Sequence, residues 1–291
     1  MPSPADFPDC YVLTIRCPDA VGIVAAVSTF LADHDAFITE SSHLGDPDTA
    51  RFFMRTVFRS ATNEPLPRDT IETRFADIAD RFSMEWALFD STEKVRTIIA
   101  VSKFGHCLND LLHRVQIGAI PINVVAVVSN HEMFKELVEW HGIPFHYLPT
   151  TSDTETEQEK EFASLIEDFD ADLVILARYM QILSDSFCRR LPGRIINIHH
   201  SFLPGFKGAN PYHQAHARGV KIIGATAHYV TADLDEGPII EQAVERVDHT
   251  MTPSDLIHLG RDTESAVLSR AVRWHGERRV LLNGTKTVVF R

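Results

Sequence analysis

The segment Arg194-Ile195-Ile196-Asn197-Ile198-His199-His200-Ser201-Phe202-Leu203-Pro204-Gly205 is the most informative part of the sequence. It starts with the isoleucines of a buried strand and ends in a loop marked by Pro and Gly. In a strand, Asn197 and His199 lie two residues apart and point to the same side. An amide can stabilise an oxyanion and an imidazole can exchange a proton near neutral pH, so this strand end is a candidate active site. A polar strand end with a hydrogen-bonded histidine is the alternative interpretation.

Short apolar runs alternate with helical patterns on both sides of this segment. The expected strands are residues 96–101, 122–128, 173–177 and 195–198, and the expected helices are 108–115, 131–141 and 157–169. Strands separated by helices are typical of a doubly wound, mainly parallel α/β sheet. In such sheets the functional residues lie at the carboxyl ends of the strands, as Asn197 and His199 do.

The first ninety residues follow a different pattern. The expected strands are 11–17, 36–44, 51–59 and 83–89, and the expected helices are 23–34 and 68–82. This βαββαβ order is that of a ferredoxin-like domain. We therefore expect two domains, residues 1–90 and 91–291, joined by a polar linker at 90–94.

Composition excludes several classes of function. The 291 residues carry a net charge of −12, which disfavours binding to nucleic acid or to an anionic membrane surface. The longest strongly apolar stretch, near 120–128, is too short for a membrane helix. The N-terminus lacks the pattern of a signal peptide. No pair of the cysteines has CxxC spacing, so they indicate reduced thiols and a cytoplasmic location: Cys10, Cys17, Cys107 and Cys188.

A second segment, residues 224–240, reads as a strand, an acidic turn that contains Asp235, and another strand. Asn-x-His, then Ser-x-Leu-Pro, then Asp-x-Gly-Pro-Ile resembles the formyltransferase family that uses 10-formyltetrahydrofolate. Residues 176–184 and 207–215 are similar to its hydrolytic branch, the formyltetrahydrofolate deformylases. Residues 17–27 resemble the opening of an ACT domain, and the fusion of an ACT domain with a formyltransferase-like domain is the deformylase arrangement.

The resemblance implies a hydrolase of a linear amide, which converts 10-formyltetrahydrofolate and water to tetrahydrofolate and formate for one-carbon and purine metabolism. It implies that Asn197 and protonated His199 stabilise the oxyanion. Asp235 would orient and deprotonate water, directly or through a relay, and His199 would return a proton to N10. It implies no cofactor and no metal ion, because the folate is the substrate.

The resemblance also implies binding residues. The pterin ring would lie in an apolar slot, and His228 would organise Asp235. The implied substrate-binding residues are Met180, Gln181, Ile182, Leu183, His228, Val230 and Leu234. In the ACT domain, the loop at Asp19, Gly22 and Ile23 is a candidate amino-acid effector site, although Ala20 and Val21 depart from the residues usual there. Family ACT domains pair edge strands, so a homo-oligomer is expected.

Three alternatives stay open. The first is formyl transfer to a small amine. The loop at 101–109 has one glycine, Gly105, which disfavours a backbone cradle for a phosphorylated acceptor. Lys103 and His106 in the same loop could still bind an anion. The second is a zinc hydrolase. The sequence has no HExxH motif, so the zinc ligands would come from His199, His200, His213 and His216. The third is a non-catalytic amino-acid or folate sensor, against which the complete set of polar residues argues. His200 could also support the site without touching substrate.

Overall fold

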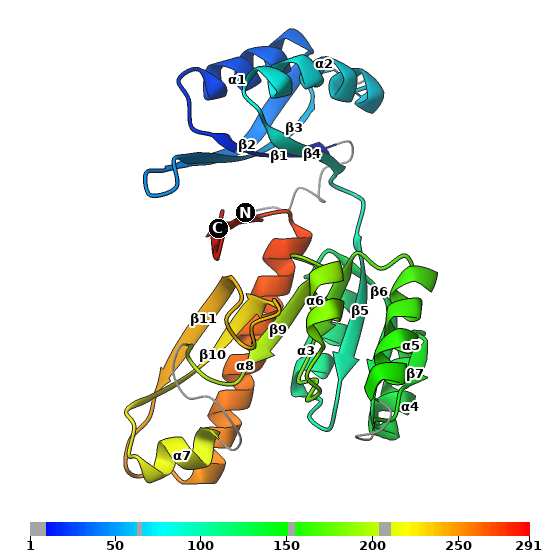
Figure 1. The fold of residues 1–291 in the computed structure, drawn as a ribbon, viewed down its shortest axis with the longest axis vertical. Coiled ribbons are helices and arrows are strands. Elements are labelled where there is room, and N and C mark those ends of the chain that lie inside the picture. Colours follow the sequence, from blue (N-terminus) through cyan, green and yellow to red (C-terminus); the bar gives the residue numbers. More distant parts are fainter. Residues whose placement is uncertain (1–9, 63–65, 151–154, 204–210) are drawn as a thin grey trace. The chain divides into compact units, whose positions relative to one another are not determined.

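The computed structural model describes residues 10–62, 66–150, 155–203 and 211–291. The chain divides into two compact units (Figure 1). The first unit comprises Met1–Lys94 with Glu277–Leu281 and Val288–Arg291, and the second comprises Val95–Gly276 with Leu282–Thr287. The main boundary thus falls at the end of the polar segment 90–94. The sequence-based division assigns all of 91–291 to the second domain. It therefore does not assign the C-terminal pieces, Glu277–Leu281 and Val288–Arg291, to the first unit.

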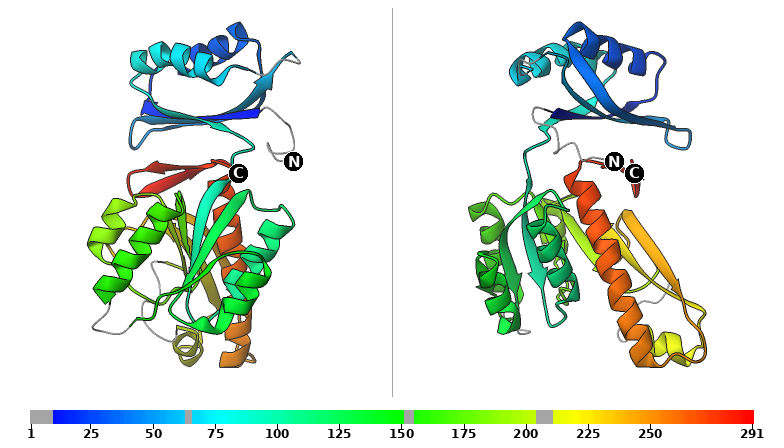
Figure 2. Two further views of the ribbon diagram at one scale, coloured as in Figure 1. Left: turned by 90° about the vertical axis from the view of Figure 1, so that its right-hand side faces the viewer. Right: turned by 180° about the vertical axis from the view of Figure 1, so that it is seen from behind.

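The first unit is a four-stranded antiparallel sheet with the order β2-β3-β1-β4. Along the chain its elements are β1 (Cys10–Pro18), α1 (Ile23–Asp33), β2 (Ala36–Asp46), β3 (Arg51–Ser60), α2 (Arg68–Arg81) and β4 (Glu85–Asp90). The predicted βαββαβ order is therefore confirmed. Both helices lie on one face of the sheet (Figure 2), where alternate residues of β1 pack against Phe30 and Phe75.

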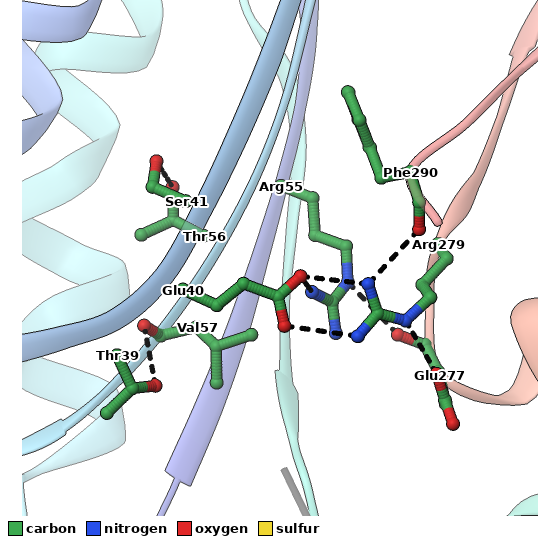
Figure 3. A network of polar contacts seen from close by, with 9 residues as sticks. All are labelled: Thr39, Glu40, Ser41, Arg55, Thr56, Val57, Glu277, Arg279 and Phe290. Atoms are coloured by element: carbon green, nitrogen blue, oxygen red, sulfur yellow. Dashed lines mark hydrogen bonds and ion pairs between the residues drawn. The ribbon is translucent and has the colours of Figure 1, made fainter. Parts of the chain in front are cut away.

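The other face of this sheet carries the C-terminal pieces of the first unit. Leu281, Val288 and Phe290 form an apolar cluster with Phe53 of β3. Beside it, fully buried Arg55 donates to Glu40, and Arg279 donates to both oxygens of the same carboxylate (Figure 3). Leu281 and Val288 belong to a short hairpin of β12 (Val280–Asn283) and β13 (Lys286–Val289), and Arg279 and Phe290 flank it.

The second unit contains a seven-stranded sheet with the order β11-β10-β9-β8-β5-β6-β7. Its strands are β5 (Val95–Val101), β6 (Ile122–Ser129), β7 (Phe145–Tyr147), β8 (Leu173–Leu176), β9 (Ile195–His199), β10 (Ile222–Tyr229) and β11 (Ile239–Arg246). The pairs from β9 through β7 are parallel, whereas β10 runs antiparallel to both β9 and β11. The predicted mainly parallel sheet is confirmed.

Helices cover this sheet. They are α3 (His106–Gln116), a 3-10 turn η2 (Glu132–Phe134), α4 (Lys135–Trp140), α5 (Glu155–Asp168), α6 (Asp185–Arg190), α7 (Pro211–Ala217) and α8 (Pro253–Gly276). Phe162 of α5 and Phe187 of α6 pack on apolar side chains of β5, β6 and β8. The long helix α8 packs on β9, β10 and β11 and against α3. Among the described helices, none is long and apolar enough to cross a membrane.

Two features differ from the predicted elements. The helix expected at 131–141 is divided at Phe134 into η2 and α4. The helices α6 and α8 and the strands β7, β12 and β13 are not among the predicted elements, whereas α7 agrees with the helix expected at His213 and His216. Part of the motif at 207–215, residues 207–210, and the Pro204-Gly205 pair lie outside the described residues. All of the cysteines are buried and unbridged.

Candidate active site

A cavity of about 400 Å³ lies in the second unit at the carboxyl ends of β8 and β9. Three parts of the chain form its walls: the strand end at 197–200, the segment 178–183 after β8, and the turn 230–235 between β10 and β11. Every residue that the sequence analysis selects in this unit as catalytic or substrate-binding lines the cavity, namely Met180, Gln181, Ile182, Leu183, Asn197, His199, His228, Val230, Leu234 and Asp235. Residues distant in sequence therefore meet at one opening.

The register between β9 and β10 positions the polar end of the cavity. Asn197 lies opposite His228, and its amide nitrogen Nδ2 is 3.3 Å from the His228 ring nitrogen Nε2. His228 uses Nδ1 to donate to the Tyr229 carbonyl at 2.9 Å, so Nε2 is the nitrogen that accepts from Asn197. Burial lowers the pKa of His228, which keeps this ring neutral. The neutral ring orients the Asn197 amide and uses one of its hydrogens.

Asp235 reaches the same place from the turn after β10. Its Oδ1 lies 3.3 Å from His199 Nδ1 and 3.8 Å from His228 Nε2. The hydrogen bond from His199 holds the pKa of the Asp235 carboxyl below its usual range, so the group is a carboxylate at neutral pH. Asp235 has a φ of 58°, a left-handed conformation that is costly for a residue with a side chain.

Gly237 allows this turn to lie directly against β10. A Cβ at this position would be 1.7 Å from the Tyr229 carbonyl oxygen, closer than any non-bonded contact. The Asp-x-Gly-Pro pattern therefore has a structural reason. Glycine permits the close approach, and the approach brings Asp235 to His199.

His199 completes the polar end. It is buried on β9, on the same side of the strand as Asn197, and both line the cavity. Its Nδ1 faces Asp235, while its Nε2 is buried and has no hydrogen-bond partner among the described residues. A buried polar atom without a partner is costly, so Nε2 is the atom left to bind a ligand.

The remaining wall is apolar and open to solvent. Met180, Ile182 and Leu234 are 53%, 78% and 61% exposed, which is unusual for such large side chains around a cavity. The segment after β8 is fixed by β5, because the Ser102 amide donates to the Arg178 carbonyl and the Met180 amide donates to the Ser102 hydroxyl. A fixed apolar rim beside polar groups is the usual site for a flat heteroaromatic ring.

A second buried polar cluster lies behind the strand end. Glu264 of α8 is 1% exposed and accepts hydrogen bonds from His106 at 2.7 Å and from Tyr212 at 2.6 Å. Arg178 lies 3.4 Å from the same carboxylate and donates to His200. The sequence indicates His106 and His200 as candidates, but it does not indicate Arg178 or Glu264. Glu264 lies on a helix that was not predicted, and no local pattern marks either residue.

The histidines considered as zinc ligands do not form one set. His213 and His216 are exposed on α7 and do not line the cavity that contains His199 and His200. In the described part of the chain, the side chains close enough to share an ion are His106, Cys107 and Glu264. The Glu264 oxygens there already accept from His106 and Tyr212, and the Arg178 cation lies beside them.

The candidate effector residues lie in the loop before α1. Gly22 precedes the helix with a φ of 97°, a conformation that favours glycine. Asp19 is exposed and its amide donates to the Ala50 carbonyl at 2.9 Å, whereas Ile23 is buried in the core of the first unit. The loop therefore presents Asp19 and Gly22 to solvent, while the Ile23 side chain anchors the helix.

Comparison with known proteins gives concordant results. The pattern of the formyl transferase family matches residues 95–272. The formyltetrahydrofolate deformylase of Corynebacterium sp. (strain P-1) is 51% identical over 281 residues, which cover 97% of this chain and 98% of the relative. That of Bacillus subtilis (strain 168) is 50% identical over 279 residues, which cover 96% and 93%. The crystal structure of the Burkholderia mallei formyltetrahydrofolate deformylase has a TM-score of 0.93 at 53% identity and covers 98% of this chain and 100% of that one.

Proposed function

This chain belongs to the formyltetrahydrofolate deformylase family and hydrolyses 10-formyltetrahydrofolate to tetrahydrofolate and formate, and we propose that it does so in the cavity at the end of β9. The observation that carries the proposal is the meeting of Asn197, His199 and Asp235 at this cavity, with His199 Nε2 buried and unpartnered among the described residues. The products belong to folate one-carbon metabolism, and purine synthesis as their destination stays a prediction.

The formyl oxygen binds between Asn197 and His199. Asn197 has a second amide hydrogen besides the one directed at His228, and it donates this hydrogen to the formyl oxygen. His199, paired with Asp235 through Nδ1, donates to the same oxygen through Nε2. As water adds to the formyl carbon, this oxygen becomes an oxyanion and both hydrogen bonds strengthen.

Asp235 receives the proton that water loses. Its carboxylate is charged at neutral pH and lies at the edge of the cavity, within reach of a water beside the formyl carbon. When the tetrahedral intermediate breaks down, the C–N bond breaks and His199 gives a proton to N10. Formic acid then gives its own proton to His199 Nε2 and leaves as formate, and Asp235 releases the proton taken from water to solvent. The cycle therefore yields tetrahydrofolate, formate and one proton, and restores the enzyme.

The pterin ring packs in the apolar part of the cavity. Met180, Ile182 and Leu234 lose exposed apolar surface when a ring covers them. Gln181, Leu183 and Val230 form the rest of this wall and fix the edge of the ring.

Water, and not an amine, is the acceptor in this proposal. A Cβ at Gly105 would be 2.4 Å from the Phe134 ring, so the single glycine of the loop after β5 is in contact with an aromatic side chain. The Phe104 ring lies below the guanidinium groups of Arg178 and Arg261. Of the two possible anion ligands in this loop, His106 already binds Glu264, and Lys103 is exposed. These contacts leave little space for a phosphorylated acceptor, which favours hydrolysis over transfer.

The first unit serves regulation and assembly as an ACT domain in this proposal. Its βαββαβ order and its exposed edge strand β2, on which Phe37 and Leu44 are 54% and 44% exposed, support pairing with a second copy. An amino-acid effector at Asp19 and Gly22 and a cytoplasmic location stay predictions. A single-copy mass from light scattering would contradict the assembly.

The direct test incubates the purified protein with 10-formyltetrahydrofolate and no amine acceptor, and measures formate. Asn197→Ala is expected to lower kcat by about 10²–10³, the usual effect of removing one oxyanion donor. The matched control is Asn123→Ala, because Asn123 is exposed on β6 and does not line the cavity. Equal rates for wild type and Asn197→Ala would remove the amide from the mechanism.

A further inference from the structure

Arg178 occupies an unexpected backbone position directly beside the candidate active site. Its φ of 63° lies in the left-handed region, where glycine is favoured and other residues are strained. The side chain is only 11% exposed, although it carries a permanent charge. A strained and largely buried arginine persists only where its contacts compensate for the cost of the strain and of the buried charge.

The partners of Arg178 join the second polar cluster to the cavity. On one side, Arg178 Nε lies 3.4 Å from Glu264 Oε2, on a carboxylate that His106 and Tyr212 also hold. On the other side, Arg178 Nη1 donates to His200 Nδ1. Both Arg178 and His200 line the cavity, so this chain of contacts runs from α8 to the substrate site.

The hydrogen bond from Arg178 fixes the tautomer of His200. A guanidinium can only donate, so His200 Nδ1 must be unprotonated and the proton of the neutral ring lies on Nε2. The His200 ring stacks on that of His199, with centroids 5.1 Å apart and an interplanar angle of 17°. Two stacked imidazolium cations would repel each other, so the charge state of His200 affects that of its neighbour.

We propose that Arg178, anchored by Glu264, is a positioning residue that holds His200 as the neutral Nε2–H tautomer, so that the ring stacked on His199 carries no positive charge. The inference rests on the role given to His199 in the proposed function. It explains why an arginine stands at a strained position: the guanidinium does not touch the formyl group but keeps the neighbouring ring from competing for the catalytic proton.

Charged and titratable groups face His200 from every element around it. They are Arg178 after β8, His199 on β9, Tyr212 on α7, Asp235 in the β10–β11 turn and Glu264 on α8. Burial lowers the pKa of His200 most, and Arg178 and His199 lower it further, to about 4, against the opposing effect of Glu264 and Asp235. Removal of Arg178 therefore allows His200 to take a proton at higher pH.

The test compares the pH dependence of formate release by wild type and Arg178→Gly. Glycine suits the left-handed backbone, so the variant keeps the local fold. The acidic limb of its kcat/KM profile is expected to move up by about one pH unit or more, the usual effect of a neighbouring charge. Arg178→Lys, which retains a donor and a charge, should move part of the way back. Arg261→Gln is the matched control, because Arg261 lies over the same Phe104 ring and does not line the cavity.

A second measurement does not need activity. Long-range ¹H–¹⁵N spectra of histidine-labelled protein report the protonation of each ring nitrogen, with His200→Gln to assign the signals. Wild type should show a His200 ring that is neutral, with Nδ1 unprotonated, down to about pH 5, and Arg178→Gly should show both nitrogens protonated at a higher pH. Superimposed acidic limbs, or an unchanged His200 signal, would overturn the inference while formate release by wild type still upholds the proposed function. Absence of formate release by wild type would instead remove the proposed function.

Discussion

At the scale of single residues, Asp235 combines a strained backbone with a charged side chain at the reaction site. Asn tolerates the left-handed conformation and has nearly the same shape, so Asp235→Asn should keep the turn and lose only the carboxylate. We expect kcat to fall by about 10²–10⁴ with little change in KM, because the lost group acts on the transferred proton. Steady-state formate release checks this. Asp233→Asn, an exposed acid in the same turn, is the control, and an equal loss in both variants would contradict the role of Asp235.

The pH dependence expected from Asp235 follows from the direction of its shift. The hydrogen bond from His199 lowers the pKa of the carboxyl in the folded protein, so its favourable contribution is present above the ordinary range of an aspartate. That contribution is lost only as pH falls through the lowered value. Asp235 itself should therefore cause no loss of activity between about pH 5 and 7, and the acidic limb there belongs to other groups. An acidic limb in this range that disappears in Asp235→Asn would contradict the assignment.

Gly237 gives a steric prediction for the same turn. Gly237→Ala places a Cβ against the Tyr229 carbonyl, which is backbone and cannot rotate away. The turn must shift, Asp235 must leave His199, and formate release should fall at least about tenfold even though no functional group is removed. Gly118→Ala is the control, because Gly118 has a φ of 75° but open space around its Cα. A wild-type rate for Gly237→Ala would show that the turn position is not required.

At this scale the sequence predicts residues that follow a local rule and misses those that depend on tertiary contact. Strand alternation predicts that Asn197 and His199 lie on one side, and a motif singles out Asp235; all three line the cavity. Arg178 and Glu264 meet only after β8 and α8 have packed, so no spacing in the chain indicates their pairing. The apolar wall at Met180 and Ile182 came from the resemblance alone, since an ordinary buried strand end has the same local pattern.

At the scale of elements, α8 contributes a buried charge as well as packing. Burial raises the pKa of Glu264, but the hydrogen bond from His106, the charge of Arg178 and the hydrogen bond from Tyr212 outweigh burial and hold it below its usual value. The group therefore stabilises the fold above the ordinary pKa of a glutamate, and this contribution is lost as pH falls through the lowered value. Glu264→Gln should cost about 3 kcal/mol at pH 7, because it leaves buried cationic and donor groups without their anion.

Urea unfolding followed by circular dichroism measures this cost at two pH values. The difference between wild type and Glu264→Gln should shrink toward pH 3, where the wild-type carboxyl begins to take up its own proton. Glu157→Gln is the control, since Glu157 pairs with Lys160 at the surface of α5. A pH-independent difference would show that the charge of Glu264 is not what stabilises α8.

The sequence predicts a helix or strand correctly where the period of its apolar residues and the length of the segment indicate the same element. Most strands of both sheets have apolar or alternating runs, and an acidic turn separates β10 from β11. The 24-residue helix α8 was missed because small and polar residues, such as Gly260 and Thr263, are buried on it. Gly260 is required there, since a Cβ would meet the Tyr212 ring at 2.2 Å. A helix that buries small and charged residues against its neighbours does not show an ordinary amphipathic stripe.

At the scale of the whole molecule, residues from both ends of the chain build the first unit. The sequence placed its βαββαβ core correctly, because each element has its own local pattern. It did not place residues 277–281 and 288–291 on this sheet, since a short hairpin carries no pattern that identifies the sheet it packs on. The contacts that decide this are those of Glu40 with Arg279 and of Arg55 with the Glu277 carbonyl, and each joins residues more than 200 positions apart along the chain.

Arg279 attaches the C-terminal segment to β2. Its guanidinium donates to both oxygens of Glu40, the same carboxylate that neutralises fully buried Arg55 (Figure 3). Without Arg279, Glu40 accepts from one cation, Arg55, instead of two. The C-terminal segment then loses its ion pair with β2. Arg279→Gln should therefore destabilise the first unit by about 2–3 kcal/mol, as expected for breaking a mostly buried ion pair.

Hydrogen exchange locates this loss. Peptides from β3 should exchange faster in Arg279→Gln, whereas peptides from β8 and β9 should keep their wild-type protection, because those strands belong to the second unit. A cycle with Glu40→Gln isolates the pair energy, and the double variant should lose less than the sum of the single variants. Faster exchange in β8 and β9 with none in β3 would show that the C-terminal segment does not stabilise the sheet on which it lies.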